Sequence, residues 1–223
     1  MKNKILSKEN IPEKIMKTLK KFYSKERRTT LNRMRKKPNA FKILISCLLS
    51  LRTKDETTEK IVKKLFSLVS KPEELAKVPL KKLEKIIYSS GYYRNKAKTI
   101  KNVAKVIINK YKGKVPSTKE ELLSIKGVGP KTANIVLGFA FNKLVIPVDT
   151  NVHRIANRLG LIKTKTPEKT IVALEKVMPK KYWKELNSLF VLHGKKICVP
   201  VSPKCSVCPL DEYCKKVGVT KKR

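Results

Sequence analysis

The stretch Leu122-Leu123-Ser124-Ile125-Lys126-Gly127-Val128-Gly129-Pro130-Lys131-Thr132-Ala133 is the most informative part of the chain. A capping pair, Ser117 with Glu120 or Thr118 with Glu121, begins a helix before it, and Pro130 suits the first turn of a second helix. Glycines permit a tight turn between the two helices, and backbone N–H groups at such a turn favour a phosphate. The open alternative is a plain helix–turn–helix whose glycines serve only close packing.

The rest of the chain carries many helix signals and few strand signals. Asp55 is predicted to cap a helix, Gly91 to follow the end of the helix that begins after Pro79, and Gly113 to stop a long helix. Apolar residues at helical spacing place helices over 11–23, 40–51, 94–112, 130–142, 150–159, 167–177 and 182–193. The predicted fold class is therefore all-α, without an internal repeat.

Charge is the most unusual property of the composition. Among 223 residues, 54 are Lys or Arg and 17 are Asp or Glu, which gives a net charge of +37. A polyanionic partner is the favoured explanation, with nucleic acid ahead of an anionic membrane surface. A lysine-rich solubilising surface, as in thermophile proteins, is the alternative. Hydrophobic residues make up 41%, enough for one domain or two small ones.

The apolar stretches are too short to cross a membrane. The longest uncharged ones, 43–51 and 133–141, fall well below the roughly 20 residues of a spanning helix. Lys2, Lys4 and Lys8 interrupt the N-terminal segment, and no apolar core of a signal peptide follows. We therefore expect neither a secreted nor a membrane protein, but a cytoplasmic, nucleoid-associated one.

Four of the five cysteines are clustered near the C-terminus. Their spacing is C-x6-C-x2-C-x5-C, formed by Cys198, Cys205, Cys208 and Cys214. Such a loop suits a tetrahedral zinc ion or a [4Fe–4S] cluster, and the spacing alone does not separate them. Two disulfides are disfavoured in a chain that is otherwise poor in cysteine. Cys47 lies in an apolar helix, where core packing is its expected role.

Two residues that follow the predicted turn in the sequence are candidates for catalysis. Lys131 lies at the start of the second helix and could act as a nucleophilic amine or only contact phosphate. Asp149 precedes the helix over 150–159, where it could cap the helix, stabilise a cationic intermediate or move protons.

Taken together, these residues resemble the endonuclease III family of helix-hairpin-helix DNA glycosylases. The resemblance covers about 40–214, most of the chain. The matching segments are Leu123 with Gly127-Val128-Gly129-Pro130-Lys131-Thr132-Ala133-Asn134, Val148-Asp149-Thr150, Arg154, Asn157-Arg158, Leu192-His193-Gly194, the four-cysteine loop, Leu48-Leu49-Ser50, Gly91-Tyr92-Tyr93 and Lys96-Ala97.

The resemblance implies two all-α lobes. One is a six-helix barrel over 33–143 that contains the helix-hairpin-helix at about 117–142. The other is a discontinuous lobe of 1–32 and 144–223, with a cluster loop over 198–214. The resemblance also favours a [4Fe–4S] cluster over zinc, with the cysteines of that loop as its ligands.

The implied activity is that of a bifunctional glycosylase and abasic-site lyase on oxidised pyrimidines in duplex DNA. Lys131 would attack C1′ of a flipped nucleotide to form a Schiff base, Asp149 would assist, and β-elimination would nick the strand 3′ to the lesion. Backbone groups of Gly127, Val128 and Gly129 would hold DNA without reading its sequence. The expected partner is duplex DNA with damaged or abasic sites, bound by a monomer.

The resemblance also assigns residues to the gap that a flipped base leaves. Arg52 and Tyr92 stand at the gap-filling positions, where bacterial relatives usually have Gln and Leu, and Asn151 stands where relatives often carry His. Two other functions remain open at this point. One is a mismatch-type glycosylase, although these generally lack the nucleophilic Lys; the other is a non-catalytic DNA-binding iron–sulfur protein. A zinc-ribbon transcription factor is a remote third.

Overall fold

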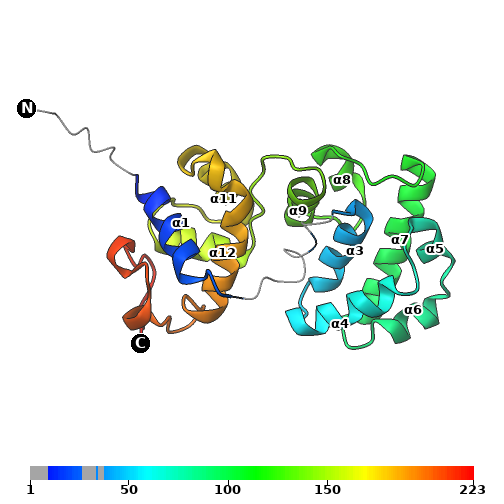
Figure 1. Cartoon of the computed structure of the whole chain (residues 1–223), viewed down its shortest axis with the longest axis horizontal. Coiled ribbons are helices and arrows are strands. Elements are labelled where there is room, and N and C mark those ends of the chain that lie inside the picture. Colours follow the sequence, from blue (N-terminus) through cyan, green and yellow to red (C-terminus); the bar gives the residue numbers. More distant parts are fainter. Residues whose placement is uncertain (1–9, 27–33, 35–37) are drawn as a thin grey trace, which may run out of the picture. The chain divides into compact units, whose positions relative to one another are not determined.

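A computed structural model describes residues 10–26, 34 and 38–223. Every regular element among them is helical (Figure 1), which confirms the predicted all-α class. No helix among the described residues is long and apolar enough to span a membrane. The α-helices are α1 Ile11–Phe22, α3 Ala40–Ser50, α4 Asp55–Phe66, α5 Pro72–Lys77, α6 Leu80–Ile86, α7 Tyr93–Tyr111, α8 Lys119–Ser124, α9 Pro130–Ala140, α10 Thr150–Arg158, α11 Pro167–Val177 and α12 Trp183–Lys196. Short 3-10 helices are η1 Lys180–Tyr182, η2 Cys205–Val207 and η3 Asp211–Tyr213.

The described residues form two compact units. The hairpin unit consists of residues 34 and 38–147, and the cysteine unit consists of residues 10–26 and 148–223. The chain passes from one unit to the other between Pro147 and Val148. The predicted boundary between residues 32 and 33 lies outside the described residues.

The core of the hairpin unit is built around α3 and α9, which pack against each other. Residues 43–49 of α3 and 132–139 of α9 are buried without interruption. A helix that is apolar all round has to be covered on every side, and α4 and α7 also contact α3. Asn39 caps α3 by accepting the Lys42 amide at 2.9 Å.

The longest helix, α7, supports the outer part of the hairpin unit. Helices α5 and α6 both pack on it, and Leu75 of α5 and Leu83 of α6 are fully buried. The helix ends at Tyr111 and is followed by Lys112 and Gly113, both with positive φ; the Gly113 amide donates to the Ile107 carbonyl at 3.0 Å. The predicted stop at Gly113 is confirmed.

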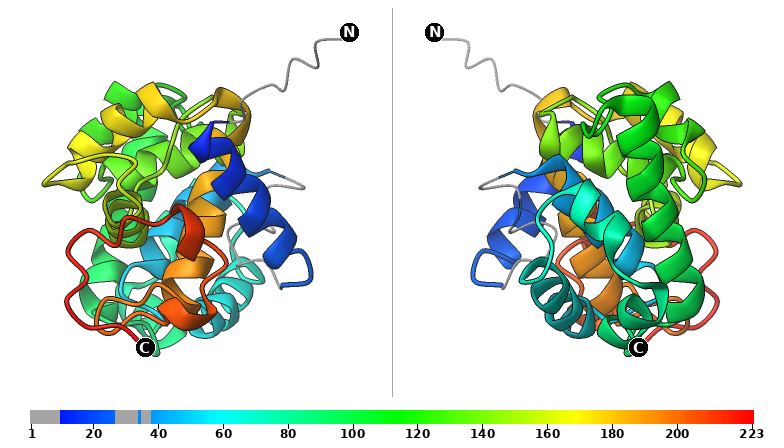
Figure 2. Two further views of the ribbon diagram at one scale, coloured as in Figure 1. Left: turned by 90° about the vertical axis from the view of Figure 1, so that its left-hand side faces the viewer. Right: turned by 90° about the vertical axis from the view of Figure 1, so that its right-hand side faces the viewer.

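The cysteine unit is organised by α12. This helix packs against α1 and α10 (Figure 2), with Ile15, Leu19, Leu186 and Phe190 fully buried. The described N-terminal segment therefore belongs to the same unit as the C-terminal cysteines, although more than 120 residues separate α1 from α10 in the sequence.

Two local predictions were wrong. Asp55 is the first residue of α4 rather than its cap; Lys54 precedes the helix and makes no side-chain cap bond. Gly91 has no positive φ and does not end a helix, since α6 already ends at Ile86. A Cβ on Gly91 would lie 2.8 Å from the Arg52 carbonyl oxygen. The glycine is therefore needed for a close approach between two segments.

Candidate nucleic-acid interface and cysteine loop

The predicted hairpin is formed by α8, a tight turn and α9. Thr118 caps α8 by accepting the Glu121 amide, and its hydroxyl donates to the Glu121 carboxylate, which confirms one of the two predicted capping pairs. The turn begins with a bond from the Val128 amide to the Ile125 carbonyl at 2.9 Å, and Val128 is buried beneath it.

The two glycines of the turn have different reasons to be glycine. Gly127 has a φ of +98°, and a Cβ there would lie 2.6 Å from a Thr99 methyl group. Gly129 is extended and exposed, and a Cβ there would meet no protein atom within 4 Å. Nothing inside the described fold therefore requires glycine at position 129, and the exposed turn is open to a ligand.

Lys131 lies in the first turn of α9, directly after Pro130. Its side chain is partly buried, and α9 packs against α3, where Cys47 is fully enclosed. Burial raises the pKa of the Cys47 thiol to about 12, and the nearby positive charge of Lys131 opposes that rise. The amine therefore lies close to the α3–α9 packing and to the N-terminal, electropositive end of α9.

Arg52 and Tyr92 adjoin each other in the hairpin unit. Arg52 donates from Nη1 to the Tyr92 hydroxyl at 3.1 Å, with its guanidinium carbon 5.4 Å from the ring centroid. Both residues have left-handed backbones, with φ of 51° and 58°, and the Tyr92 side chain is 62% exposed. Left-handed φ costs about 1 kcal/mol or more in a residue other than glycine, so the surrounding structure has to stabilise both turns.

A buried lysine, Lys96, lies beneath these two turns. Its ammonium donates to the Leu49 carbonyl at 2.8 Å, to the Leu51 carbonyl, to Thr53 Oγ1 at 2.8 Å and to Ser90 Oγ at 2.7 Å. The residue is only 9% exposed, and burial lowers its pKa to about 8. Before the fold was known, Lys96 stood out only as a match to the family pattern.

Asp149 caps α10 in the cysteine unit. Its Oδ1 accepts the backbone amides of Asn151 and Val152, each at 2.9 Å, and its Oδ2 accepts the Asn151 side-chain amide at 3.2 Å. These three bonds fix the orientation of the carboxylate, whose side chain is partly buried. Lys131 belongs to the hairpin unit and Asp149 to the cysteine unit.

Arg154 connects this cap to the cysteine loop. Its Nη2 donates to Asn151 Oδ1 at 2.8 Å and to the Cys198 carbonyl at 2.9 Å. A Cβ on Gly194 would lie 2.6 Å from Asn151 Oδ1 and 2.9 Å from Arg154 Nη2. Gly194 therefore leaves the space in which these bonds form. Burial lowers the pKa of the Arg154 guanidinium, and the nearby Cys198 and Asp149 oppose that effect.

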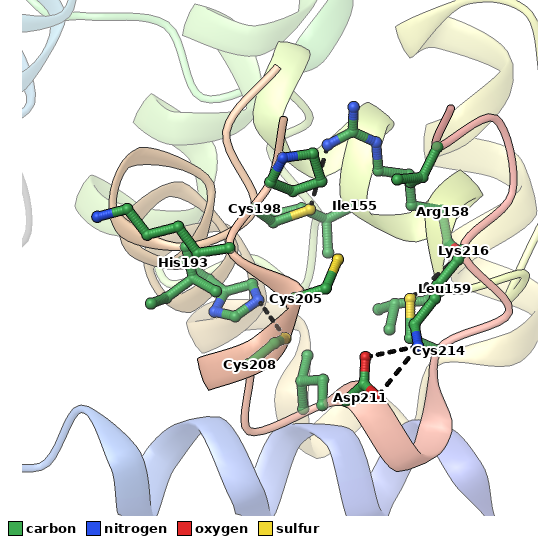
Figure 3. A pocket seen from close by; sticks show the side chains of 15 residues that line it. Ile155, Arg158, Leu159, His193, Cys198, Cys205, Cys208, Asp211, Cys214 and Lys216 are labelled. Carbon is green, nitrogen blue, oxygen red and sulfur yellow. Dashed lines mark hydrogen bonds and ion pairs between the residues drawn. The ribbon is translucent and has the colours of Figure 1, made fainter. Parts of the chain in front are cut away.

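The four clustered cysteines line one pocket of the cysteine unit (Figure 3). All five cysteines of the chain are free thiols. Within the described residues, no group of three His, Cys, Asp or Glu side chains could hold a metal ion. Burial raises the pKa of the Cys208 thiol to about 11, with a smaller rise from the neighbouring cysteines, and burial also raises that of Cys214.

Two nitrogen donors reach the sulfur atoms of the pocket. Arg158 Nη1 lies 3.5 Å from Cys198 Sγ, and the same guanidinium donates to the Val199 carbonyl at 2.7 Å and the Pro200 carbonyl at 2.6 Å. His193 Nε2 lies 3.6 Å from Cys208 Sγ, and Figure 3 shows the ring directed at that sulfur.

A tyrosine orients this histidine. Burial lowers the pKa of His193 to about 4, so the ring is neutral, and its Nδ1 lies 3.0 Å from the Tyr23 hydroxyl. If Tyr23 donates to Nδ1, the ring proton is on Nε2 and is directed at Cys208. Residue spacing could not reveal Tyr23, because 170 positions separate it from His193.

Comparison with known proteins assigns the family. The HhH-GPD superfamily of base excision DNA repair proteins matches residues 45–180. Endonuclease III of Thermotoga maritima is 48% identical over 182 residues, covering 82% of this chain and 85% of that protein. The chain belongs to the endonuclease III family.

More distant relatives agree with this assignment. Endonuclease III of Bacillus subtilis is 37% identical over 79% of this chain and 81% of its own length. A trapped covalent intermediate of endonuclease III with DNA has a TM-score of 0.81 and 33% identity, covering 92% of this chain and 96% of that one. The chain is thus a DNA glycosylase and abasic-site lyase of the endonuclease III type, and the resemblance drawn from the sequence is confirmed.

Proposed function

We propose that this endonuclease III-type enzyme removes oxidised pyrimidines from duplex DNA and then nicks the abasic site, with Lys131 as nucleophile. One observation carries the assignment of Lys131: it lies in the first turn of α9, directly after an exposed turn that is open at Gly129. A phosphate held at the turn would place the adjoining sugar near that lysine. The relative trapped as a covalent intermediate with DNA supports the same chemistry.

Lys131 would act in two stages. Its amine forms a bond to C1′ as the glycosidic bond breaks, and the base leaves with the electron pair and gains a proton. Loss of the amine proton and opening of the sugar ring give a Schiff base. Removal of the C2′ proton then expels the 3′ phosphate by β-elimination. These steps require only the amine and proton-transfer groups.

Asp149 is proposed to assist base release. Its carboxylate is held by the amides of Asn151 and Val152, so its orientation is set before DNA binds. A fixed negative charge stabilises positive charge that develops on the sugar, and a carboxylate can also take part in proton transfer.

Arg52 and Tyr92 are proposed to fill the gap that the flipped nucleotide leaves. The exposed Tyr92 ring can stack on a neighbouring base, and the Arg52 guanidinium can donate to the orphan base. Gly127, Val128 and Gly129 are proposed to bind the phosphate backbone. Their backbone groups carry no base information, so this contact positions the DNA.

The four cysteines that line the pocket are proposed to hold a [4Fe–4S] cluster, as membership of the family suggests. Cys198, Cys205, Cys208 and Cys214 surround one cavity, and a cluster takes one thiolate at each iron. Arg158 and His193 supply hydrogen bonds to two of the sulfurs, which stabilise thiolate ligands. Bound there, the cluster would cross-link the loop; no reaction step requires it.

We further propose that the enzyme works as a nucleoid-associated monomer on damaged or abasic sites.

Borohydride trapping tests the proposed nucleophile. Wild-type protein, Lys131→Gln and Lys126→Gln are incubated with a thymine glycol duplex and sodium borohydride. Lys126 is an exposed lysine of the same turn, so its variant controls for the loss of one positive charge near DNA. We expect adducts with wild type and Lys126→Gln at saturating protein, and none with Lys131→Gln. Strand cleavage by clean Lys131→Gln protein would overturn the assignment.

A further inference from the structure

We propose that Lys96 is a positioning residue that holds Arg52 and Tyr92 in place as one unit, ready to enter the DNA stack. The inference rests on the proposed gap-filling role of these two residues and adds to it the group that organises them. Two turns distant in sequence carry the pair: Leu51–Thr53 follows α3, and Ser90–Tyr92 precedes α7.

The ammonium of Lys96 joins the two turns directly. From the first turn of α7 it reaches the Leu49 carbonyl and Thr53 Oγ1 on the α3 side, each at 2.8 Å. It also donates to Ser90 Oγ at 2.7 Å, on the side of Tyr92. An ammonium has three N–H donors and no acceptor, so the four oxygen atoms around Lys96 share its three N–H bonds.

The backbone of each turn is also hydrogen-bonded to Lys96. The Lys96 amide donates to the Tyr92 carbonyl at 3.0 Å, and the ammonium donates to the Leu51 carbonyl, directly before Arg52. The Arg52 carbonyl lies against Gly91 so closely that no Cβ would fit. A shift of the Leu51–Thr53 turn would therefore be passed on to Tyr92.

The left-handed backbones of Arg52 and Tyr92 need such support. Neither residue is glycine, and neither φ value is favoured without neighbours that fix it. The Thr53 and Ser90 hydroxyls lie 3.1 Å apart, which closes the polar cluster around the ammonium. Lys96 itself is buried and would touch no DNA, so its effect on DNA has to pass through the two exposed residues.

A matched pair of lysine variants tests the proposal. Lys96→Met removes the ammonium and keeps an unbranched side chain. Lys101→Met is the control, because Lys101 lies on the same helix and also donates to two carbonyls, those of Ala76 and Val78. Each variant is assayed under single-turnover conditions on a thymine glycol duplex and on a single-stranded abasic oligonucleotide. The second substrate has no orphan base and no stack to fill.

We expect Lys96→Met to change the ratio of the rate of excision from the duplex to the rate of cleavage of the single strand. Lys96→Met should slow excision from the duplex by about tenfold or more, because small displacements of positioned groups are costly, and should change single-strand cleavage by less than about twofold. Lys101→Met should leave the ratio unchanged. A wild-type ratio in folded Lys96→Met would overturn the proposal. Absence of cleavage by wild type on both substrates would overturn the proposed function instead.

Two further measurements keep the proposal testable if Lys96→Met folds poorly. Ser90→Ala removes one acceptor and should change the ratio in the same direction by about threefold, as expected for one lost hydrogen bond; an unchanged ratio would contradict the proposal. In an Arg52→Ala, Tyr92→Ala background, Ser90→Ala should cause little additional loss, because the residues that it positions are already gone. A full additive loss would show that the cluster acts elsewhere.

Discussion

Arg52 donates to the Tyr92 hydroxyl at 3.1 Å, across 40 positions of sequence, and both residues have left-handed backbones. Their pairing exists in the protein without DNA. A guanidinium and an aromatic ring that already hold each other need less ordering when they enter a duplex. This is the physical basis for treating them as one preorganised unit.

The Tyr92 ring should matter more than its hydroxyl. Tyr92→Phe keeps the stacking surface and loses only the bond to Arg52, so we expect duplex excision to fall by about threefold. Tyr92→Ala removes the ring, worth about 1–3 kcal/mol of base stacking, and should slow excision by about tenfold or more. Single-turnover kinetics on a thymine glycol duplex provide the measurement. Equal rates for the two variants would refute a stacking role.

Two substitutions of Asp149 should distinguish its structural role from its chemical role. Asp149→Asn can still cap α10 but has no charge, so we expect nearly wild-type thermal stability and base release slowed by about a hundredfold. Asp149→Ala also loses the cap and should be less stable by about 1 kcal/mol. Thermal unfolding and single-turnover base release are measured side by side. An undiminished rate in Asp149→Asn would reduce this residue to a helix cap.

Cluster binding and the order of the cysteine loop should depend on Cys208 and not on Cys47. Cys208→Ser is expected to lose bound iron and sulfide, the brown visible absorbance and the protease resistance of the 198–214 loop. Cys47→Ala removes a buried thiol from α3 and should keep all three properties. Iron and sulfide analysis with limited proteolysis checks the pair. Wild-type protein purified anaerobically with zinc in place of iron would contradict the cluster assignment.

Lys96 should make the free energy of unfolding rise with pH at alkaline pH. Its pKa is lowered by burial from 10.5 to about 8. Below about pH 8 the folded and unfolded states both hold the proton, whereas between about 8 and 10.5 the unfolded state holds more. The free energy of unfolding of wild type, relative to Lys96→Met, should therefore rise with pH in this window, by at most about 1.4 kcal/mol per pH unit. Denaturant titrations of both proteins at several pH values measure it; a difference that falls over the window would contradict the burial effect.

The local signals of the sequence were sufficient for most helices and for the hairpin. Thr118 with Glu121, Pro130 and Gly113 act within one or two turns of the chain, so their residue types predicted the observed geometry. The prediction for Gly91 was wrong because glycine is required there by the close approach of the Arg52 carbonyl, which is a neighbour in space rather than in sequence. Asp55 was misplaced by one residue, an error that an acidic first turn readily produces.

The supporting residues of the site were beyond sequence reasoning for the same reason. Lys96 is one of many lysines, and only the fold shows that three of its four acceptors lie more than 40 residues earlier, between Leu49 and Thr53. Arg154 and Gly194 belonged to matching segments, but their shared contact with Asn151 depends on how α12 packs against α10.

The most direct test of Lys131 as the nucleophile is to locate the covalent bond. Wild-type protein is trapped on thymine glycol DNA with borohydride, digested with protease and nuclease, and analysed by mass spectrometry. We expect a reduced sugar adduct on Lys131, in the peptide that begins the α9 helix. An adduct on another lysine or on the N-terminal amine would contradict it.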